Sequence, residues 1–266
     1  MELTDKVAIV TGGAGGIGKA LAWKFVEEGA RGVVVADLEQ ADPAAVAADI
    51  GERAVAFAGD VSDEQTVRAL IARAEEAFGP VDLFCANAGV AVGIGLEDDD
   101  AVWDQAFGVN IRSHIYAARV LVPGWVERGS GYFLTTASAA GMLTQIGSAP
   151  YAVTKHAAVA FAEWLSVTYG SSGIRASCLC PMGVNTAMLN AGIDAEDGVT
   201  AGDVVRAAGG VVEPEQVADN VVAALREERF LVLPHPEVLT FFQRKASDYD
   251  RWLAGMRRLQ AAVTGV

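Results

Sequence analysis

The chain has 266 residues, of which 52% are hydrophobic and 29 are glycine, so it can bury a large core in one α/β domain. Its formal net charge of −14 argues against a nucleic-acid partner or an anionic membrane surface, because both require clustered lysine and arginine. No apolar run reaches the length of a membrane-spanning helix, so we expect no membrane partner.

Short apolar runs alternate along the chain with longer helical patterns. The predicted strands are Val7–Thr11, Gly32–Ala36, Ala54–Ala58, Val81–Ala86, Gly131–Thr136, Ile174–Cys180 and Phe230–Leu233. The predicted helices are Ile17–Glu28, Glu64–Phe78, Val102–Arg128, Pro150–Tyr169 and Pro214–Glu227. Near-continuous apolar strands separated by helices indicate a parallel sheet covered on both faces. The sequence therefore predicts a doubly wound Rossmann fold with a seven-stranded parallel sheet, in a single domain over residues 1–266.

A glycine-rich turn, Thr11-Gly-Gly-Ala-Gly-Gly-Ile-Gly18, joins the first predicted strand to the first helix. It satisfies G-x-G-x-x-G in one register and T-G-x-x-x-G-x-G in another. Glycines let the backbone approach a pyrophosphate, and a helix N-terminus offers free N–H groups. We therefore predict a dinucleotide site formed by Gly12, Gly15, Gly16, Ile17 and Gly18.

Asp37, with Leu38 after it, falls at the end of the second predicted strand. A carboxylate there can accept hydrogen bonds from ribose hydroxyls and would repel a 2′-phosphate. No lysine or arginine lies within the glycine turn or just after Asp37. A plain turn residue is the alternative interpretation, but the sequence favours NAD over NADP.

Polar residues also follow the next two strands. Asp60-Val61 comes after the third strand and Asn87-Ala88-Gly89 after the fourth. Ligands of open α/β sheets bind beyond the carboxyl ends of the strands, so both segments are candidates, although each could equally be a turn. Asn110 is a polar residue in an otherwise apolar helical patch.

Tyr151 and Lys155 stand at positions i and i+4 of a predicted helix, so they share one face. A phenol has an ordinary pKa of about 10, and a neighbouring ammonium would lower that pKa by about 1–3 units. The tyrosine could then exchange a proton with an alcohol. The alternative interpretation is a helix that carries one aromatic residue and one solvated lysine without a catalytic role. Ser138 lies upstream of the pair.

Together these motifs resemble those of the short-chain dehydrogenase/reductase family over nearly the whole chain. The glycine turn resembles the cofactor motif, Asn87-Ala88-Gly89 the structural N-A-G motif, and the catalytic tetrad corresponds to Asn110, Ser138, Tyr151 and Lys155. The segment Pro181–Thr186 resembles the P-G-x-x-x-T segment beside the nicotinamide, which adds Pro181, Gly183, Val184 and Thr186 to the expected cofactor site. In two departures, Met182 replaces the usual glycine and Ala86 replaces a frequent asparagine.

The resemblance implies hydride transfer between NAD and a secondary alcohol or ketone. Tyr151 would be the acid-base group, Lys155 would lower its pKa and bind the nicotinamide ribose, and Ser138 would orient the reacting oxygen. Asn110 would anchor a water in a proton relay. An epimerase or dehydratase, or a dinucleotide-sensing regulator, are the alternatives on the same fold.

The segment at about 182–212 is too long for an ordinary connection, and we interpret it as a substrate loop. Its apolar residues, with those of Ala91–Leu96 and those after Ser138, favour a neutral substrate; cyclic and steroid-like alcohols are candidates. The segment contains Met182, Met188, Leu189 and Ile193, one basic residue, Arg206, and the acidic residues Asp194, Glu196, Asp197 and Asp203.

By resemblance we expect a homotetramer, with an unusually apolar C-terminal segment in one interface. That segment contains Phe241, Phe242, Trp252, Leu253 and Met256, and its folding back onto its own domain is the alternative. Cys85, Cys178 and Cys180 show no metal-ligand spacing, so we expect core packing, no metal and a cytoplasmic protein. The first strand starts almost at once, without a leader-like segment before it.

Overall fold

The computed structural model describes residues 1–191, 205 and 209–264. The strands are β1 (Val7–Thr11), β2 (Gly32–Asp37), β3 (Ala54–Ala58), β4 (Leu83–Ala86), β5 (Gly131–Thr136), β6 (Ile174–Leu179), β7 (Gly183–Val184), β8 (Val211–Val212) and β9 (Leu231–Val232). The helices are α1 (Gly16–Glu27), α2 (Pro43–Ile50), α3 (Glu64–Phe78), α4 (Asp100–Phe107), α5 (Ser113–Arg128), α6 (Ala149–Tyr169), α7 (Ala187–Asn190), α9 (Pro214–Glu227), α10 (Glu237–Ser247) and α11 (Tyr249–Thr264).

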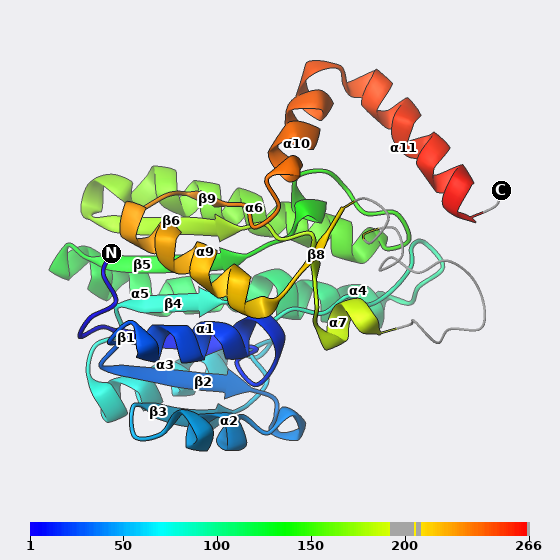
Figure 1. Ribbon diagram of the computed structural model, residues 1–266. Coiled ribbons are helices and arrows are strands. Elements are labelled where there is room, and N and C mark those ends of the chain that lie inside the picture. The colour runs from blue at the N-terminus through cyan, green and yellow to red at the C-terminus, as the bar shows by residue number, and fades with distance from the viewer. Residues whose placement is uncertain (192–204, 206–208, 265–266) are drawn as a thin grey trace.

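Seven strands form one parallel sheet in the order β3-β2-β1-β4-β5-β6-β9 (Figure 1). Helices cover both of its faces, so the predicted doubly wound fold with a seven-stranded parallel sheet is confirmed. The strand order reverses between β1 and β4, which pair directly. Crevices for ligands in such sheets open at this reversal, beyond the carboxyl ends of the strands.

Each strand of the sheet supplies side chains to two cores, because successive residues point to opposite faces. In β2, Val33 and Val35 belong to the core under α1 and α2, whereas Val34 belongs to the core under α3. All three are fully buried. This two-sided burial explains why the strands read as continuous apolar runs.

The predicted helix Val102–Arg128 is helical throughout, but it contains a π-helical turn that the sequence did not indicate. This turn, Gly108–Arg112, separates α4 from α5. Asn110 lies in the middle of this turn. A π-helical turn accommodates one extra residue, and the apolar pattern of the sequence does not record it. Helix α2, which Asp42 caps by accepting a hydrogen bond from the backbone N–H of Ala45, was also missed.

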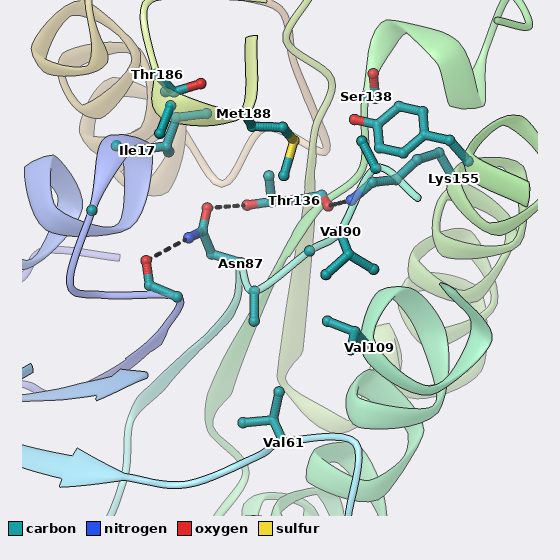
Figure 2. A pocket seen from close by; sticks show the side chains of 18 of the residues that line it. Ile17, Val61, Asn87, Val90, Val109, Thr136, Ser138, Lys155, Thr186 and Met188 are labelled. Carbon is teal, nitrogen blue, oxygen red and sulfur yellow. Dashed lines mark hydrogen bonds between the residues drawn. The ribbon is translucent and has the colours of Figure 1, made fainter. Parts of the chain in front are cut away.

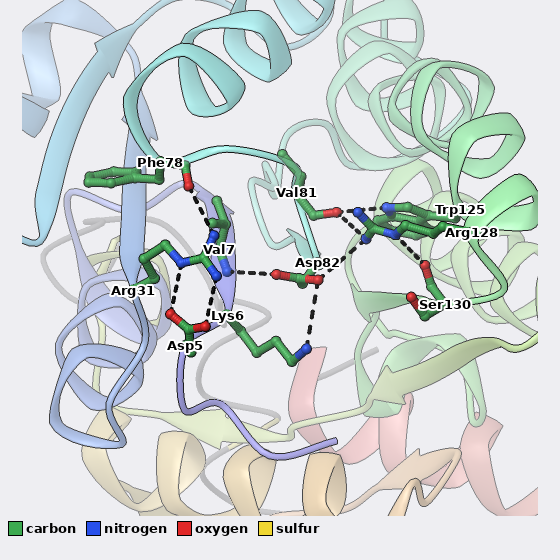
Figure 3. Close-up of polar contacts among 10 residues, drawn as sticks. All are labelled: Asp5, Lys6, Val7, Arg31, Phe78, Val81, Asp82, Trp125, Arg128 and Ser130. Atoms are coloured by element: carbon green, nitrogen blue, oxygen red, sulfur yellow. Dashed lines mark hydrogen bonds and ion pairs between the residues drawn. The ribbon is translucent and has the colours of Figure 1, made fainter.

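Charged side chains tie together the amino end of the sheet, opposite the reversal-point crevice. One Asp82 carboxylate oxygen accepts from the backbone N–H of Val7 at 3.0 Å, and the other lies 3.5 Å from Arg128 and 3.9 Å from Lys6 (Figure 3). Trp125 of α5 donates to the Val81 carbonyl at 2.8 Å. These contacts fix the starts of β1 and β4 to the end of α5.

The C-terminal helices fold back only in part. Phe241 and Trp252 pack against the cluster that contains Met142, and Lys245 donates to the Met142 carbonyl at 2.8 Å. Phe242 and Leu253 remain 39% exposed. All three cysteines are buried and unpaired, as expected for core packing. Within the described residues, no helix is long and apolar enough to cross a membrane.

Candidate active site

A cavity of about 650 Å³ opens at the carboxyl ends of the strands, at the reversal between β1 and β4. Most of the sequence-predicted site residues line it: Gly12, Gly15, Gly16, Ile17, Asp37, Leu38, Asp60, Val61, Asn87, Ala88, Gly89, Ser138, Tyr151, Lys155, Pro181, Val184 and Thr186. Gly18, Asn110 and Gly183 do not line it. The structure thus brings together residues from seven separate segments of the chain.

The glycine turn is shaped so that only glycine fits at two of its positions. Gly12 and Gly16 have φ angles of +63° and +48°, in the left-handed region that other residues rarely adopt. Gly15 caps α1 without any side-chain hydrogen bond, and a Cβ added to it would meet nothing within 4 Å. Gly15, Gly16 and Ile17 all line the cavity, so the start of α1 borders its open space. Gly18 serves packing instead, since its Cβ would lie 2.0 Å from the Gly12 carbonyl oxygen.

Asp37 holds the glycine turn in place as well as lining the cavity. Its Oδ2 accepts from the backbone N–H of Ala14 at 3.0 Å, and its Oδ1 from that of Leu38 at 2.8 Å. Each carboxylate oxygen keeps a further lone pair for a ligand hydroxyl. Within the described ranges, Lys155 and Arg112 are the positively charged residues that line the cavity, and Arg112 lies 3.4 Å from Asp104.

A chain of hydrogen bonds connects the glycine turn to Lys155 (Figure 2). The Asn87 amide donates to the Thr11 carbonyl at 3.0 Å and accepts from the Thr136 hydroxyl at 3.1 Å. The Thr136 carbonyl then accepts from Lys155 Nζ at 2.9 Å. Sequence reasoning missed Thr136, because its decisive atom is a backbone carbonyl that every residue has.

Tyr151 and Ser138 both line the cavity, and the Ser138 hydroxyl is the hydrogen-bonding group that acts on the Tyr151 phenol. Burial raises the pKa of the Tyr151 phenol above 10, although the bond with Ser138 acts in the opposite direction. The expectation that the lysine lowers this pKa is therefore wrong for this arrangement. Lys155 Nζ lies 5.6 Å from the centre of the tyrosine ring and is turned towards the Thr136 carbonyl, so burial dominates.

Lys155 is itself deeply buried, with 3% of its surface exposed. Burial lowers the pKa of its ammonium from 10.5 to about 8. A buried cation disfavours its own charge because the surrounding groups replace water poorly. Lys155 therefore titrates close to neutral pH, which is unusual for lysine and typical of functional sites.

Asn110 lies behind the cavity wall and is fully buried. Its carbonyl oxygen accepts from the Val90 N–H at 2.8 Å, and its amide nitrogen donates to the Val90 carbonyl at 2.9 Å and to Thr154 at 3.0 Å. A Cβ added to Gly89 would lie 3.2 Å from Lys155 Nζ and 3.3 Å from Asn110 Oδ1. Asn110 thus approaches Lys155 across Gly89, and its part in a proton relay stays a prediction.

The expected substrate-side segments contribute unequally. Ala91, Met182, Met188, Leu189 and Val205 line the cavity, as do Val90, Gln145 and Ser148, which the sequence did not single out. By contrast, Met142 and Leu143 are buried in a separate core cluster. Ile94 and Leu96 are largely exposed. Ile193, Arg206 and the acidic residues at 194, 196, 197 and 203 lie outside the described residues.

Comparison with known proteins decides the family. The family model described as short chain dehydrogenase matches residues 6–197. The chain belongs to this family. Among other short-chain dehydrogenases, it is 36% identical over 250 residues to 1-deoxy-11-beta-hydroxypentalenate dehydrogenase of Streptomyces exfoliatus, covering 89% of this chain and 86% of the relative.

Two further family members cover much of the chain. The 3beta-hydroxysteroid dehydrogenase 2 of Eggerthella lenta is 34% identical over 190 residues, which covers 69% of this chain and 73% of that protein. The crystal structure of a short chain dehydrogenase/reductase from Burkholderia phymatum in complex with NAD superposes with a TM-score of 0.84. That structure is 30% identical and covers 94% of this chain and 96% of its own.

Proposed function

We propose that the protein is an NAD-dependent oxidoreductase that interconverts a secondary alcohol and a ketone. One observation carries this proposal: Tyr151, Ser138 and the buried Lys155 line the same cavity as the glycine turn and Asp37. An intact acid-base group beside a dinucleotide site also distinguishes this function from that of a dinucleotide-sensing regulator.

The residues present fit a dinucleotide without a 2′-phosphate. The open start of α1, formed at Gly15, suits a pyrophosphate because free N–H groups and the helix dipole both favour an anion. Asp37 would accept from ribose hydroxyls and repel a 2′-phosphate, and Arg112 is already paired with Asp104. The NAD complex of the Burkholderia phymatum relative supports the same assignment.

When bound, the nicotinamide gives or accepts the hydride. The Tyr151 phenol, whose raised pKa keeps it protonated at neutral pH, donates a proton to the oxygen of a ketone. In the direction of oxidation the phenol must first lose its own proton, and the resulting phenolate then takes the proton from the hydroxyl group. Ser138 orients the phenol and the reacting oxygen relative to each other. Lys155 supplies a cation whose protonation changes near neutral pH.

The substrate we propose is neutral, apolar and cyclic, and residues 182–212 would form the substrate loop. The described wall around Tyr151 is apolar at Val90, Ala91, Met182 and Met188 and polar at Ser148. A wall of this kind discriminates between substrates by their size and shape, and it can hydrogen-bond few polar groups of a ligand. The names of the two dehydrogenase relatives denote hydroxylated compounds, one of them a steroid.

The assembly we propose is a homotetramer in the cytoplasm. Helix α6 presents Val153, Trp164 and Val167 to solvent, with 45%, 52% and 84% of their surfaces exposed, and α10 and α11 expose Phe242 and Leu253. Apolar faces of this kind support association with further copies. Sedimentation velocity at micromolar concentration should show a tetramer, and a monomer would contradict the proposal. Three buried free thiols fit a reducing compartment.

The test of the reaction follows NADH absorbance when the protein is given NAD and a panel of cyclic secondary alcohols. We expect turnover, and we expect Tyr151→Phe to lose about 10²–10⁴-fold in kcat with NAD affinity unchanged, because only the proton-transfer group is removed. Retention of most of the rate in Tyr151→Phe would refute the role of the phenol. NAD binding without turnover on any substrate would favour the regulator.

A further inference from the structure

The departure of this chain from the family motif, Met182 in place of glycine, has a structural counterpart far along the chain. The Met182 backbone N–H donates to Nδ1 of His235 at 3.2 Å. The Met182 side chain lies against Gly209, since a Cβ added there would come within 2.2 Å of the Met182 methyl carbon. Both the backbone and the side chain of Met182 are thus held by residues outside the motif.

His235 is buried, with 2% of its surface exposed, and both nitrogens of its ring have partners. Its Nε2 lies 3.0 Å from the Gly183 carbonyl oxygen and 3.2 Å from the Gly210 carbonyl oxygen. A carbonyl can only accept, so Nε2 carries the hydrogen and Nδ1 offers the lone pair that Met182 needs. A single neutral tautomer satisfies the three contacts together.

These contacts join three parts of the chain at the base of the proposed substrate loop. Gly183 belongs to β7, Gly210 comes directly before β8, and His235 stands between β9 and α10. Strands β7 and β8 pair in parallel at the same place, with Gly183 opposite Val211. The imidazole therefore fastens the start and the return of the segment 182–212 to each other and to the sheet.

We propose that His235 is a positioning residue that sets the wall of the substrate pocket formed by Met182. It fixes the backbone on either side of the Met182–Gly183 peptide, and Gly209 leaves the space in which the methionine side chain lies. This inference rests on the proposed function, because Met182 lines the same cavity as Tyr151. His235 acts through Met182 and touches no reacting atom.

The decisive variants are His235→Leu, which removes both donor and acceptor, and His235→Gln, whose amide can restore one of each. The control is Val238→Ala: Val238 is fully buried in α10, in the core cluster against which Met182 packs, and its truncation removes none of the three contacts of the imidazole. It should lower the stability of the protein while the bond from the Met182 N–H to His235 remains. Thermal unfolding of each variant measures how much stability it has lost, so that variants with equal losses can be compared.

Hydrogen exchange at the Met182 amide, measured in the protein without NAD, reports the contact directly. We expect His235→Leu to speed this exchange about tenfold or more, and Val238→Ala at equal loss of stability to leave it nearly unchanged. We also expect His235→Leu to raise KM for a bulky cyclic alcohol about tenfold, with NAD affinity within about threefold of wild type. His235→Gln should recover most of both effects.

Gly209→Ala tests the second half of the inference without altering His235. The added methyl group would displace the Met182 side chain, so kcat/KM should fall more for a polycyclic alcohol than for cyclohexanol. The inference is overturned if the Met182 amide exchanges equally in His235→Leu and Val238→Ala, or if neither His235→Leu nor Gly209→Ala changes substrate preference. Absence of turnover in the wild type would sink the proposed function alone, because the exchange measurement needs no substrate.

Discussion

Replacing Lys155 by methionine should make the folded protein more stable while it destroys activity. Burial lowers the pKa of Lys155 from 10.5 to about 8, which costs the folded state about 3 kcal/mol at pH 7. Methionine fills a similar volume without a charge. The substitution also leaves the Thr136 carbonyl without its bond to Nζ, at a cost of about 1–3 kcal/mol. We therefore expect a net gain of about 1 kcal/mol at pH 7.

The stability difference between Lys155→Met and wild type should also depend on pH. Between pH 8 and 10.5 the unfolded chain holds the Lys155 proton and the folded chain releases it, so wild-type stability from this group rises with pH. Lys155→Met lacks this contribution. Its advantage over wild type should therefore shrink by about 1 kcal/mol between pH 7 and pH 9.

Urea unfolding of the NAD-free protein at pH 7 and pH 9, followed by tryptophan fluorescence, measures both differences. Lys245→Met is the matched control, because it removes another buried lysine whose Nζ bonds a carbonyl and lies 5.4 Å from the centre of the Tyr249 ring. That variant shows how far replacing a buried, carbonyl-bonded lysine by methionine changes stability elsewhere in the protein. A Lys155→Met protein that is less stable than wild type at pH 7, or whose difference is the same at both pH values, would refute the reasoning.

Two further predictions concern the cofactor end and the wall beside Lys155. Asp37→Ala should narrow the preference of kcat/KM for NAD over NADP about tenfold or more, and equal use of both by the wild type would count against the role of this carboxylate. Gly89→Ala should reduce kcat about tenfold or more, because its Cβ would lie 3.2 Å from Lys155 Nζ. An unchanged rate in a variant with a wild-type circular dichroism spectrum would show that Lys155 has room to move.

Local features of the fold and the site could be predicted from the sequence. The strands of the main sheet differ from the predicted ones only at their ends, because the apolar run of each is continuous and, except in the half-buried edge strand β3, buried on both faces. The glycine turn and the Tyr151–Lys155 pair could be predicted from the sequence in the same way. Both depend on spacing within one turn or one helix, which the order of residues fixes.

Features that depend on burial or on partners far apart in the chain could not be predicted from the sequence. The π-helical turn at Asn110 leaves the apolar pattern of its helix unchanged, so one continuous helix was predicted. The direction of the Tyr151 pKa was predicted wrongly, because the sequence shows the neighbouring lysine but not how deeply the phenol is buried.

The sequence by itself indicated the fold class and the family of this protein, and the residues that we expect to carry its chemistry. The tertiary structure alone decided how those residues are held: Lys155 by the Thr136 carbonyl, and Met182 by His235. The physical reason is the range of the interactions. Helix spacing and strand burial act between near neighbours, whereas a buried lysine or imidazole finds its partners only when the sheet brings distant segments together.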